Sequence, residues 1–194
     1  ILSSARSTRL ALQIDSEIEA IKNSIELVRV DIRALADSKL PKNDELKAWF
    51  EKTKSQGGGE AWKRAASFEK LNDANKKALL ESWKKVNYAP LVMSVNQDSL
   101  TKLKAIEDSV KAGTAFAAAA QASGLPVVTT DYFAHGEMPK AGGTDLAIDS
   151  RDFHNQVLTL AAGAVSGVIQ TPTSVLIFRL RDRKVVPDAD LALT

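Results

Sequence analysis

The residues of this chain that could act as a base, a nucleophile or a metal ligand are few. The chain has 194 residues with two histidines and no cysteine, which excludes thiolate catalysis, cysteine-based zinc sites and disulfides. His135 lies in a glycine-containing stretch and His154 in an expected helix, without a third ligand at the spacing of a metal site. We therefore expect both histidines to be solvated surface residues, and we expect no metal and no cofactor.

Other chemical signatures are missing as well. The glycine run 57–59 lacks the following Lys-Ser/Thr of a phosphate-binding loop, and no serine stands in a nucleophile elbow. The net charge of +2 implies neither an acidic nor a basic partner. Basic residues between 47 and 85 surround three tryptophans, but they alternate with acids and the tryptophans follow a helical period. We expect no nucleic-acid partner.

The clearest local pattern lies near the C-terminus. Phe153, Val157 and Leu160 are three or four residues apart, so they share one face of an expected helix. The runs 168–170 and 175–180 are rich in β-branched and large apolar residues, and turn-forming residues separate them. The pattern predicts a helix that leads into an antiparallel hairpin.

The N-terminal half is typical of helices. Residues 3–39 contain no glycine or proline and predict one long helix, followed by helices over 44–55, 60–71 and 73–86. Apolar residues recur in the first helix at steps close to a heptad: Leu10, Ile14, Ile18, Ile21, Ile25, Val28, Ile32 and Leu35. This seam either packs against the next helices or forms a dimer or client-binding groove.

The C-terminal half changes character. The β-prone run 91–95 follows a proline and predicts a strand, which precedes helices over 98–111 and 115–122. A second short strand over 127–130 and a loop over 131–148 lead to the helix and hairpin described above. Mixed strands and helices with a final antiparallel hairpin predict an α+β fold with a small antiparallel sheet.

These elements predict three regions. Residues 1–87 form an all-α scaffold around the long helix 3–39, residues 88–186 form the α+β domain, and residues 187–194 form a polar tail. The chain begins at Ile1, and no apolar run reaches the roughly 18–20 residues that span a bilayer. We interpret it as a fragment or processed form whose targeting signal or membrane anchor has been removed.

The order of elements over 88–184 resembles a parvulin-type (PpiC, rotamase) peptidyl-prolyl isomerase domain. Segment 111–120 is similar to the family pattern K-x-G-x-x-F-x-x-x-A, segment 152–166 to the helix and G-x-V-S turn, and segment 170–183 to the closing hairpin. Segment 131–138 resembles the loop before that helix. Segment 40–50 resembles the lead-in of secreted bacterial folding factors of the SurA and PpiD kind.

The resemblance implies catalysis of rotation about X–Pro bonds. That rotation has a barrier of about 20 kcal/mol, and its catalysis makes no bond and needs no cofactor. Family members hold the proline ring in an apolar cup of Phe, Met and Leu and favour the twisted amide over both planar states. A pair of hydrogen-bonded histidines lies on their two central strands.

The family's residues carry over only in part. Phe153 falls on the cup Phe, while Thr171 and Thr173 fall on hydroxyl positions of the hairpin. Leu176 stands where the hairpin histidine is expected, and the expected first strand 91–95 contains no histidine. The candidate residues of a proline cup are therefore Phe153, Leu176, Thr171, Thr173, Met93 and Phe133.

Two further positions depart from the family pattern. Asp149 and Ser150 replace the Met and Gln that precede the cup Phe, and Asp131 is nearest to the acid or thiol beside the histidines. The resemblance therefore implies a degenerate site to which no catalytic residue is assigned, and it leaves open whether the chain is an enzyme.

Three functions follow from these observations. The first is a chaperone-like factor of the periplasm or cell envelope that binds unfolded, nascent or proline-containing polypeptides without isomerising them. The second is an active peptidyl-prolyl isomerase that works with Phe153 and its apolar neighbours. The third is a structural or assembly protein that forms a homodimer through the long N-terminal helix.

Overall fold

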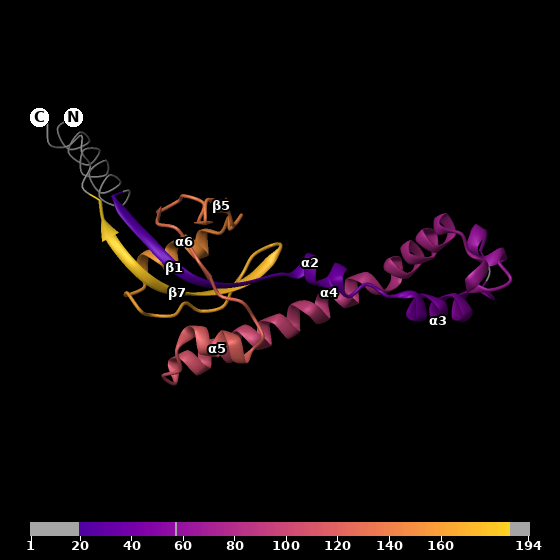
Figure 1. The fold of residues 1–194 in the computed structure, drawn as a ribbon, viewed down its shortest axis with the longest axis horizontal. Coiled ribbons are helices and arrows are strands. Elements are labelled where there is room, and N and C mark those ends of the chain that lie inside the picture. Colours follow the sequence, from indigo (N-terminus) through magenta and orange to yellow (C-terminus); the bar gives the residue numbers. More distant parts are fainter. Residues whose placement is uncertain (1–19, 57, 187–194) are drawn as a thin grey trace, which may run out of the picture. The chain divides into compact units, whose positions relative to one another are not determined.

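The fold is α+β, with an antiparallel sheet and surrounding helices, as the sequence predicts (Figure 1). The computed structural model describes residues 20–56 and 58–186. It divides into two compact units, with the boundaries after Val30 and after Asp98. We call residues 31–98 the helical unit, and the described residues on either side of it in sequence the sheet unit.

The main sheet has the strand order β2-β1-β7-β6. Its two long strands are β1 (Ile21–Asp31) and β7 (Ser174–Val185), and its short strands are β2 (Val128–Thr129) and β6 (Ile169–Gln170). A further short strand, β3 (Phe133–Ala134), also pairs with β1. The pairs of β1 with β2 and β3, and of β6 with β7, are antiparallel.

β1 and β7 lie side by side at the centre of the sheet (Figure 1). Asn23, near the start of β1, bonds Arg183, near the end of β7, whereas Arg29 bonds Ser174 at the start of β7. This opposite order of contacts makes the central pair antiparallel as well.

The prediction of one helix over 3–39 is wrong in its described part. Residues 21–31 form β1, and only Ile32–Ser38 form a helix, α2, which the Asp31 carboxylate caps at the Ala34 N–H. Residues 3–19 of that prediction lie outside the described residues. The prediction that residues 1–87 are all helical is therefore wrong, because β1, a central strand of the main sheet, lies within that range.

The helices of the sheet unit cover opposite faces of the sheet. α6 (Arg151–Thr159) lies on one side, whereas α5 (Phe116–Ala122) and residues 99–111 of α4 lie on the other (Figure 1). Leu176, Phe178 and Leu180 of β7 belong to the same buried cluster as α6 residues, as alternation along a strand requires. The final helix and hairpin are thus confirmed.

A single helix, α4 (Asp73–Lys111), replaces three predicted elements. The helices expected over 73–86 and 98–111 are parts of it, but the strand expected over 91–95 is wrong, and the boundary at 87/88 falls within the helix. Pro90 removes the hydrogen bond to the Val86 carbonyl. Both Val86 and Pro90 are exposed, so water can satisfy that carbonyl without breaking the helix.

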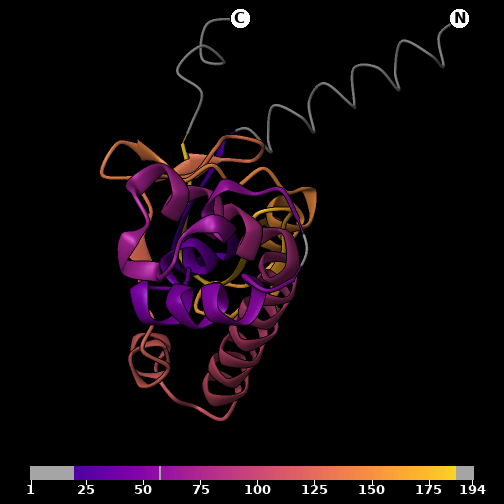
Figure 2. The same cartoon turned by 90° about the vertical axis from the view of Figure 1, so that its right-hand side faces the viewer.

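The helical unit has its own small core. α3 (Asn43–Thr53) confirms the helix expected over 44–55, whereas the helix expected over 60–71 is replaced by two 3₁₀ turns, η1 (Ala61–Arg64) and η2 (Phe68–Lys70). Figure 2 shows the α3 helix and the turns that follow it, in indigo to magenta. The buried members of this core are Leu46, Phe50, Trp62, Phe68, Leu71 and Leu79.

The stretch 131–148 is less irregular than expected. It contains β3 and a two-stranded hairpin of β4 (Lys140–Ala141) and β5 (Thr144–Asp145). Arg29 of β1 holds this stretch, because its guanidinium donates to the Leu146 carbonyl at 2.9 Å. The loop is therefore fixed to the central strand of the sheet. The predicted tail, residues 187–194, lies outside the described residues.

Candidate active site

α6 positions the candidate cup residue Phe153. The Ser150 hydroxyl caps the helix by accepting a hydrogen bond from the Phe153 N–H at 3.3 Å. Phe153 and Val157 are four residues apart, so both point to the sheet, and both are buried. The local sequence thus turns the Phe153 ring towards the strands, as the family's cup requires.

Phe153 lies in an aromatic cluster and not on an open surface. Its ring stacks on Phe133, with centroids 6.1 Å apart and planes at 18°, and meets Phe178 edge-on at 5.2 Å. Leu176 and Ile148 belong to the same cluster. Phe153 and Leu176 are 0% exposed, so neither lines a cup that is open in this structure.

An open pocket of about 340 Å³ lies beside this cluster. Phe133 is its link to the aromatic cluster, since it lines the pocket on one side and stacks on Phe153 on the other. The full lining is Asp131, Tyr132, Phe133, Glu137, Met138, Lys140 and Asp145, and we call this hollow the 131–145 pocket. Tyr132 and Met138 are exposed, which gives the pocket a solvent-accessible apolar wall.

The carboxylates of the 131–145 pocket are held by backbone N–H groups. Asp131 accepts from Gly143, and Asp145 accepts from Ala147. Glu137 differs, because it accepts from the Ala134 N–H and also pairs with the ammonium of Lys22 at 3.3 Å. These two contacts keep the pKa of Glu137 below its ordinary value, the backbone bond first and Lys22 second.

The two histidines lie next to each other, which contradicts their prediction as solvated surface residues. His135 follows β3 and His154 lies on α6, and both are half-buried. Their rings meet at 86° with centroids 5.8 Å apart, and His154 also lies edge-on to Phe153 at 5.2 Å. Burial first, and the neighbouring His135 second, lower the pKa of His154.

The hydroxyl candidates Thr171 and Thr173 lie in the β6–β7 turn. The Thr171 hydroxyl lies 2.9 Å from the Ser174 hydroxyl and accepts from the Ser174 N–H at 3.0 Å. Thr173 is exposed, and its N–H points at the Thr171 hydroxyl. Arg29 in turn donates to Ser174. The hydroxyl of Thr171 thus shapes the turn.

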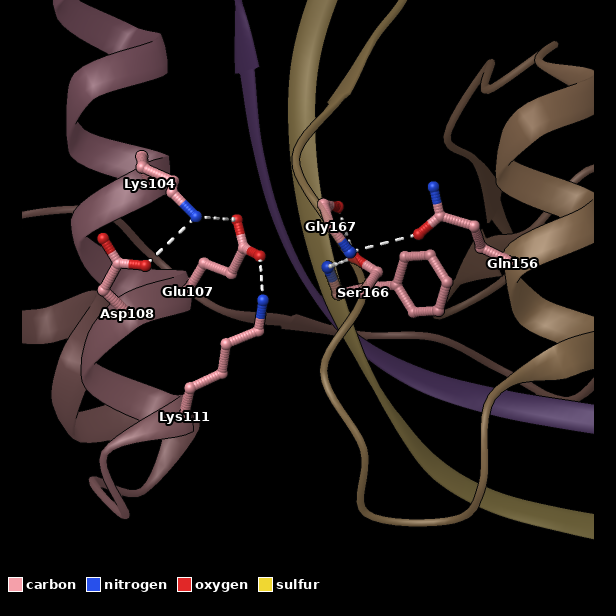
Figure 3. Close-up of polar contacts among 8 residues, drawn as sticks. Lys104, Glu107, Asp108, Lys111, Gln156, Ser166 and Gly167 are labelled. Carbon is pink, nitrogen blue, oxygen red and sulfur yellow. Dashed lines mark hydrogen bonds and ion pairs between the residues drawn. The ribbon is translucent and has the colours of Figure 1, made fainter.

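The family's G-x-V-S turn has a structural role. Ser166 is buried, its N–H donates to the Phe178 carbonyl, and its hydroxyl accepts from the Phe178 N–H at 2.9 Å. The side-chain oxygen of Gln156, on α6, accepts from the Gly167 N–H at 3.1 Å (Figure 3). These bonds attach the segment before β6 to β7 and to α6.

A charged cluster marks α4 in the same unit. Glu107 is 6% exposed and pairs with both Lys104 and Lys111, while Lys104 also reaches Asp108 (Figure 3). The hydrogen bond from Lys111 is the largest cause of the lowered pKa of Glu107. All four residues lie on one helix at spacings of three and four, so the cluster supports α4 and lacks the features of a site.

The structure brings together only some of the predicted site residues. Phe133, Phe153 and Leu176 share one cluster. Met93 lies on α4 in the helical unit with 72% exposure, and not on the strand from which its place in the cup was predicted. Asp131 lines the 131–145 pocket.

Sequence reasoning missed other parts of this region. The sequence places Tyr132 and Met138 in the loop segment 131–138 and does not indicate that they form a pocket wall, although a Met and a Tyr among acidic residues could have suggested one. Arg183 bonds Asn23 and the α6 carbonyls of Val157 and Leu158, and nothing local in the sequence indicates that role.

The described residues contain neither a cluster of metal ligands nor a helix that could cross a membrane. Within residues 20–56 and 58–186, no group of three or more His, Cys, Asp or Glu side chains is arranged to hold a metal ion. In the same part of the chain, every helix is too short or too polar to cross a bilayer.

Comparison with known proteins identifies the family. Neither the curated proteins nor the solved structures contain a match to this chain. The family model described as "PPIC-type PPIASE domain" matches residues 41–192, which include α4, the 131–145 pocket and β7. The chain therefore belongs to the PPIC-type, or parvulin-type, peptidyl-prolyl isomerase family.

Proposed function

We propose that this chain is an extracytoplasmic folding factor that binds unfolded or proline-containing polypeptides without isomerising them efficiently. Family membership supports a polypeptide substrate. The observation that carries the proposal is the contrast between two surfaces. The cup residues Phe153 and Leu176 are completely buried, whereas the adjoining 131–145 pocket is open and partly apolar.

The pocket supports binding of a proline ring. Tyr132, Phe133 and Met138 supply aromatic and thioether surface, and the volume of about 340 Å³ is within the usual range of small-ligand pockets, about 300–1,000 Å³. Met adapts its shape to different partners, which suits clients of varied sequence. The Phe133–Phe153 stack gives this wall a rigid backing.

The central strands argue against efficient catalysis. Neither β1 nor β7 contains a histidine, and Leu176 occupies the position expected for one. On the face that carries Leu176, the neighbouring cluster members of β1 are Ile25 and Leu27. Without histidines on these two strands, apolar contacts make most of the distinction between the twisted amide and the planar one.

An active isomerase is the second candidate. His135 and His154 form a contacting pair beside Phe153, although they come from a loop and a helix instead of two strands. Such a pair would supply polar groups near the bound amide. Localisation in the periplasm or cell envelope, and a homodimer through N-terminal residues, remain predictions.

Methionine NMR tests the binding proposal, because the chain has two methionines, Met93 and Met138. With ¹³C-methyl labelling, a proline peptide that enters the 131–145 pocket should shift the Met138 signal saturably and leave Met93 unchanged. Met93→Leu and Met138→Leu assign the two signals. A saturable shift of Met93 alone would place binding on the helical unit and contradict the proposal.

A further inference from the structure

The 131–145 pocket carries an excess of negative charge. Its lining has three carboxylates, Asp131, Glu137 and Asp145, and one ammonium group, that of Lys140. Lys22 neutralises Glu137 through the ion pair at 3.3 Å. In the part of the chain that the structure describes, neither Asp131 nor Asp145 forms an ion pair with a cationic side chain, although Lys140 is the cross-strand partner of Asp145. Three carboxylates against the ammonium groups of Lys22 and Lys140 leave one negative charge in excess at the pocket.

Both free carboxylates are fixed in position. Asp131 accepts from the Gly143 N–H at 2.9 Å, and its own N–H donates to the Lys140 carbonyl at 2.7 Å. Asp145 accepts from the Ala147 N–H at 3.1 Å and lies on β5, which pairs with β4. Each of these hydrogen bonds uses one carboxylate oxygen and leaves the other available to a ligand.

The apolar wall complements these charges. A lysine or arginine side chain has an aliphatic stem with a cationic end, and such side chains pack their stems on apolar surface. Met138 offers that surface beside Asp131 and Asp145, as does the part of the Tyr132 ring that the Lys184 ammonium, 3.6 Å from its centroid, does not cover. An aspartate or glutamate of a client would instead meet two unpaired carboxylates.

We propose that the 131–145 pocket selects polypeptides in which a lysine or arginine stands next to proline, with the cationic group bound by Asp131 and Asp145. This inference rests on the proposed function, since it assumes that the pocket is where a proline segment binds. It adds the chemical class of the preferred client.

A matched peptide series tests the preference through the Met138 methyl signal. The peptides are acetyl-Ala-X-Pro-Ala-amide with X as lysine, arginine, norleucine or glutamate, and norleucine keeps the lysine stem without the charge. At low salt the lysine peptide should bind about two- to fivefold more tightly than the norleucine peptide, the range of a partly exposed ion pair. The advantage should fall as salt rises, because salt screens exposed charges.

Variants separate the contributions of the charges. Asp131→Asn and Asp145→Asn keep a side-chain acceptor for the backbone N–H, and each should reduce the lysine-over-norleucine ratio. Lys140→Met should raise that ratio. Asp108→Asn, on α4, removes an exposed carboxylate outside the pocket and should leave the ratio unchanged. Amide NMR spectra of each variant establish that it folds. The salt dependence is measured on the unmodified protein, so it tests the preference even if a variant fails to fold.

The outcomes distinguish two failures. Equal affinities for lysine and norleucine peptides, with saturable Met138 shifts, would overturn the preference for basic residues and leave the pocket as a proline site. A lysine preference that Asp131→Asn and Asp145→Asn leave intact would also overturn the inference. The absence of any Met138 shift with all four peptides would overturn both the inference and the proposed function.

Discussion

The imidazole rings of His135 and His154 meet edge to face, with centroids 5.8 Å apart and planes at 86°. They are the two histidines of the chain, and they come from a loop and a helix that are joined by 18 intervening residues. The Nδ1 atoms of both are buried without a hydrogen-bond partner among the described residues. The proximity of His135 is one cause of the lowered pKa of His154, after burial.

The histidine pair predicts a loss of stability at acid pH. The folded-state pKa of His154 is lower than its ordinary value of 6.5, so the unfolded chain binds this proton more tightly. The free energy of unfolding should therefore fall as pH falls from about 7 to 5, although the nearby Asp149 partly offsets the effect. Urea denaturation at several pH values, followed by β7 amide signals, measures this dependence.

His135→Gln and His154→Gln are the matched variants for that measurement. His135→Gln removes the neighbour that disfavours the charged form of His154, and His154→Gln removes the titrating group. Both should flatten the pH dependence of stability between about pH 7 and 5. An unchanged slope in both variants would show that other groups cause the acid sensitivity.

Phe153→Ala should lower the free energy of unfolding of the sheet unit, whatever its effect on peptide binding. Phe153 is 0% exposed and contacts Phe133 and Phe178, so its removal leaves a cavity and should cost about 3–5 kcal/mol. Phe153→Leu keeps most of the volume and should cost less than half of that. Urea denaturation followed by β7 amide signals measures the free energy of unfolding of both variants. Equal and small losses would contradict the close packing of the Phe153 ring in this cluster.

The choice of signal matters because all three tryptophans, Trp49, Trp62 and Trp83, lie in the helical unit. Tryptophan fluorescence therefore follows the unfolding of that unit, whereas β7 amides follow the sheet unit. A substitution in the aromatic cluster around Phe153 should directly alter the unfolding transition that the β7 amides report.

Arg183→Met should destabilise the sheet unit. The guanidinium donates to Asn23 and to the carbonyls of Val157 and Leu158 at the end of α6, so it joins β1, β7 and α6. Its loss should cost about 1.5–3 kcal/mol, the range for hydrogen bonds to a charged group. Arg181→Met, at an exposed position on the same strand, is the control and should change stability little.

The sequence predicts the end of the chain better than its beginning. The helix, turn and hairpin over 151–185 have local signals, because α6 is amphipathic and the turn residues favour their conformation. β1 has no such signal, since a central strand is buried on both faces and loses the two-residue alternation. Asn23 and Ser24 are both buried within it, and its apolar residues also fit a helical spacing.

The candidate site, too, contains residues whose positions have a local sequence signal and residues whose positions have none. The position of Phe153 on the sheet-facing side of α6 could be predicted, because it follows from the helical period. The adjacency of His135 and His154, and the pocket between Asp131 and Asp145, depend on how the loop folds back on itself. Those contacts have no repeating sequence pattern, so they could not be predicted from periodicity.

The proposed function requires that the sheet unit binds proline segments but does not isomerise them efficiently. NMR exchange spectroscopy on the acetyl-Ala-Lys-Pro-Ala-amide peptide, without a coupled protease, measures the cis–trans exchange rate directly. We predict that adding the protein shifts the Met138 methyl signal while the exchange rate stays at its uncatalysed value. If the protein instead accelerates the exchange, and the His154→Gln variant accelerates it less, the proposal is contradicted and the chain is an active isomerase.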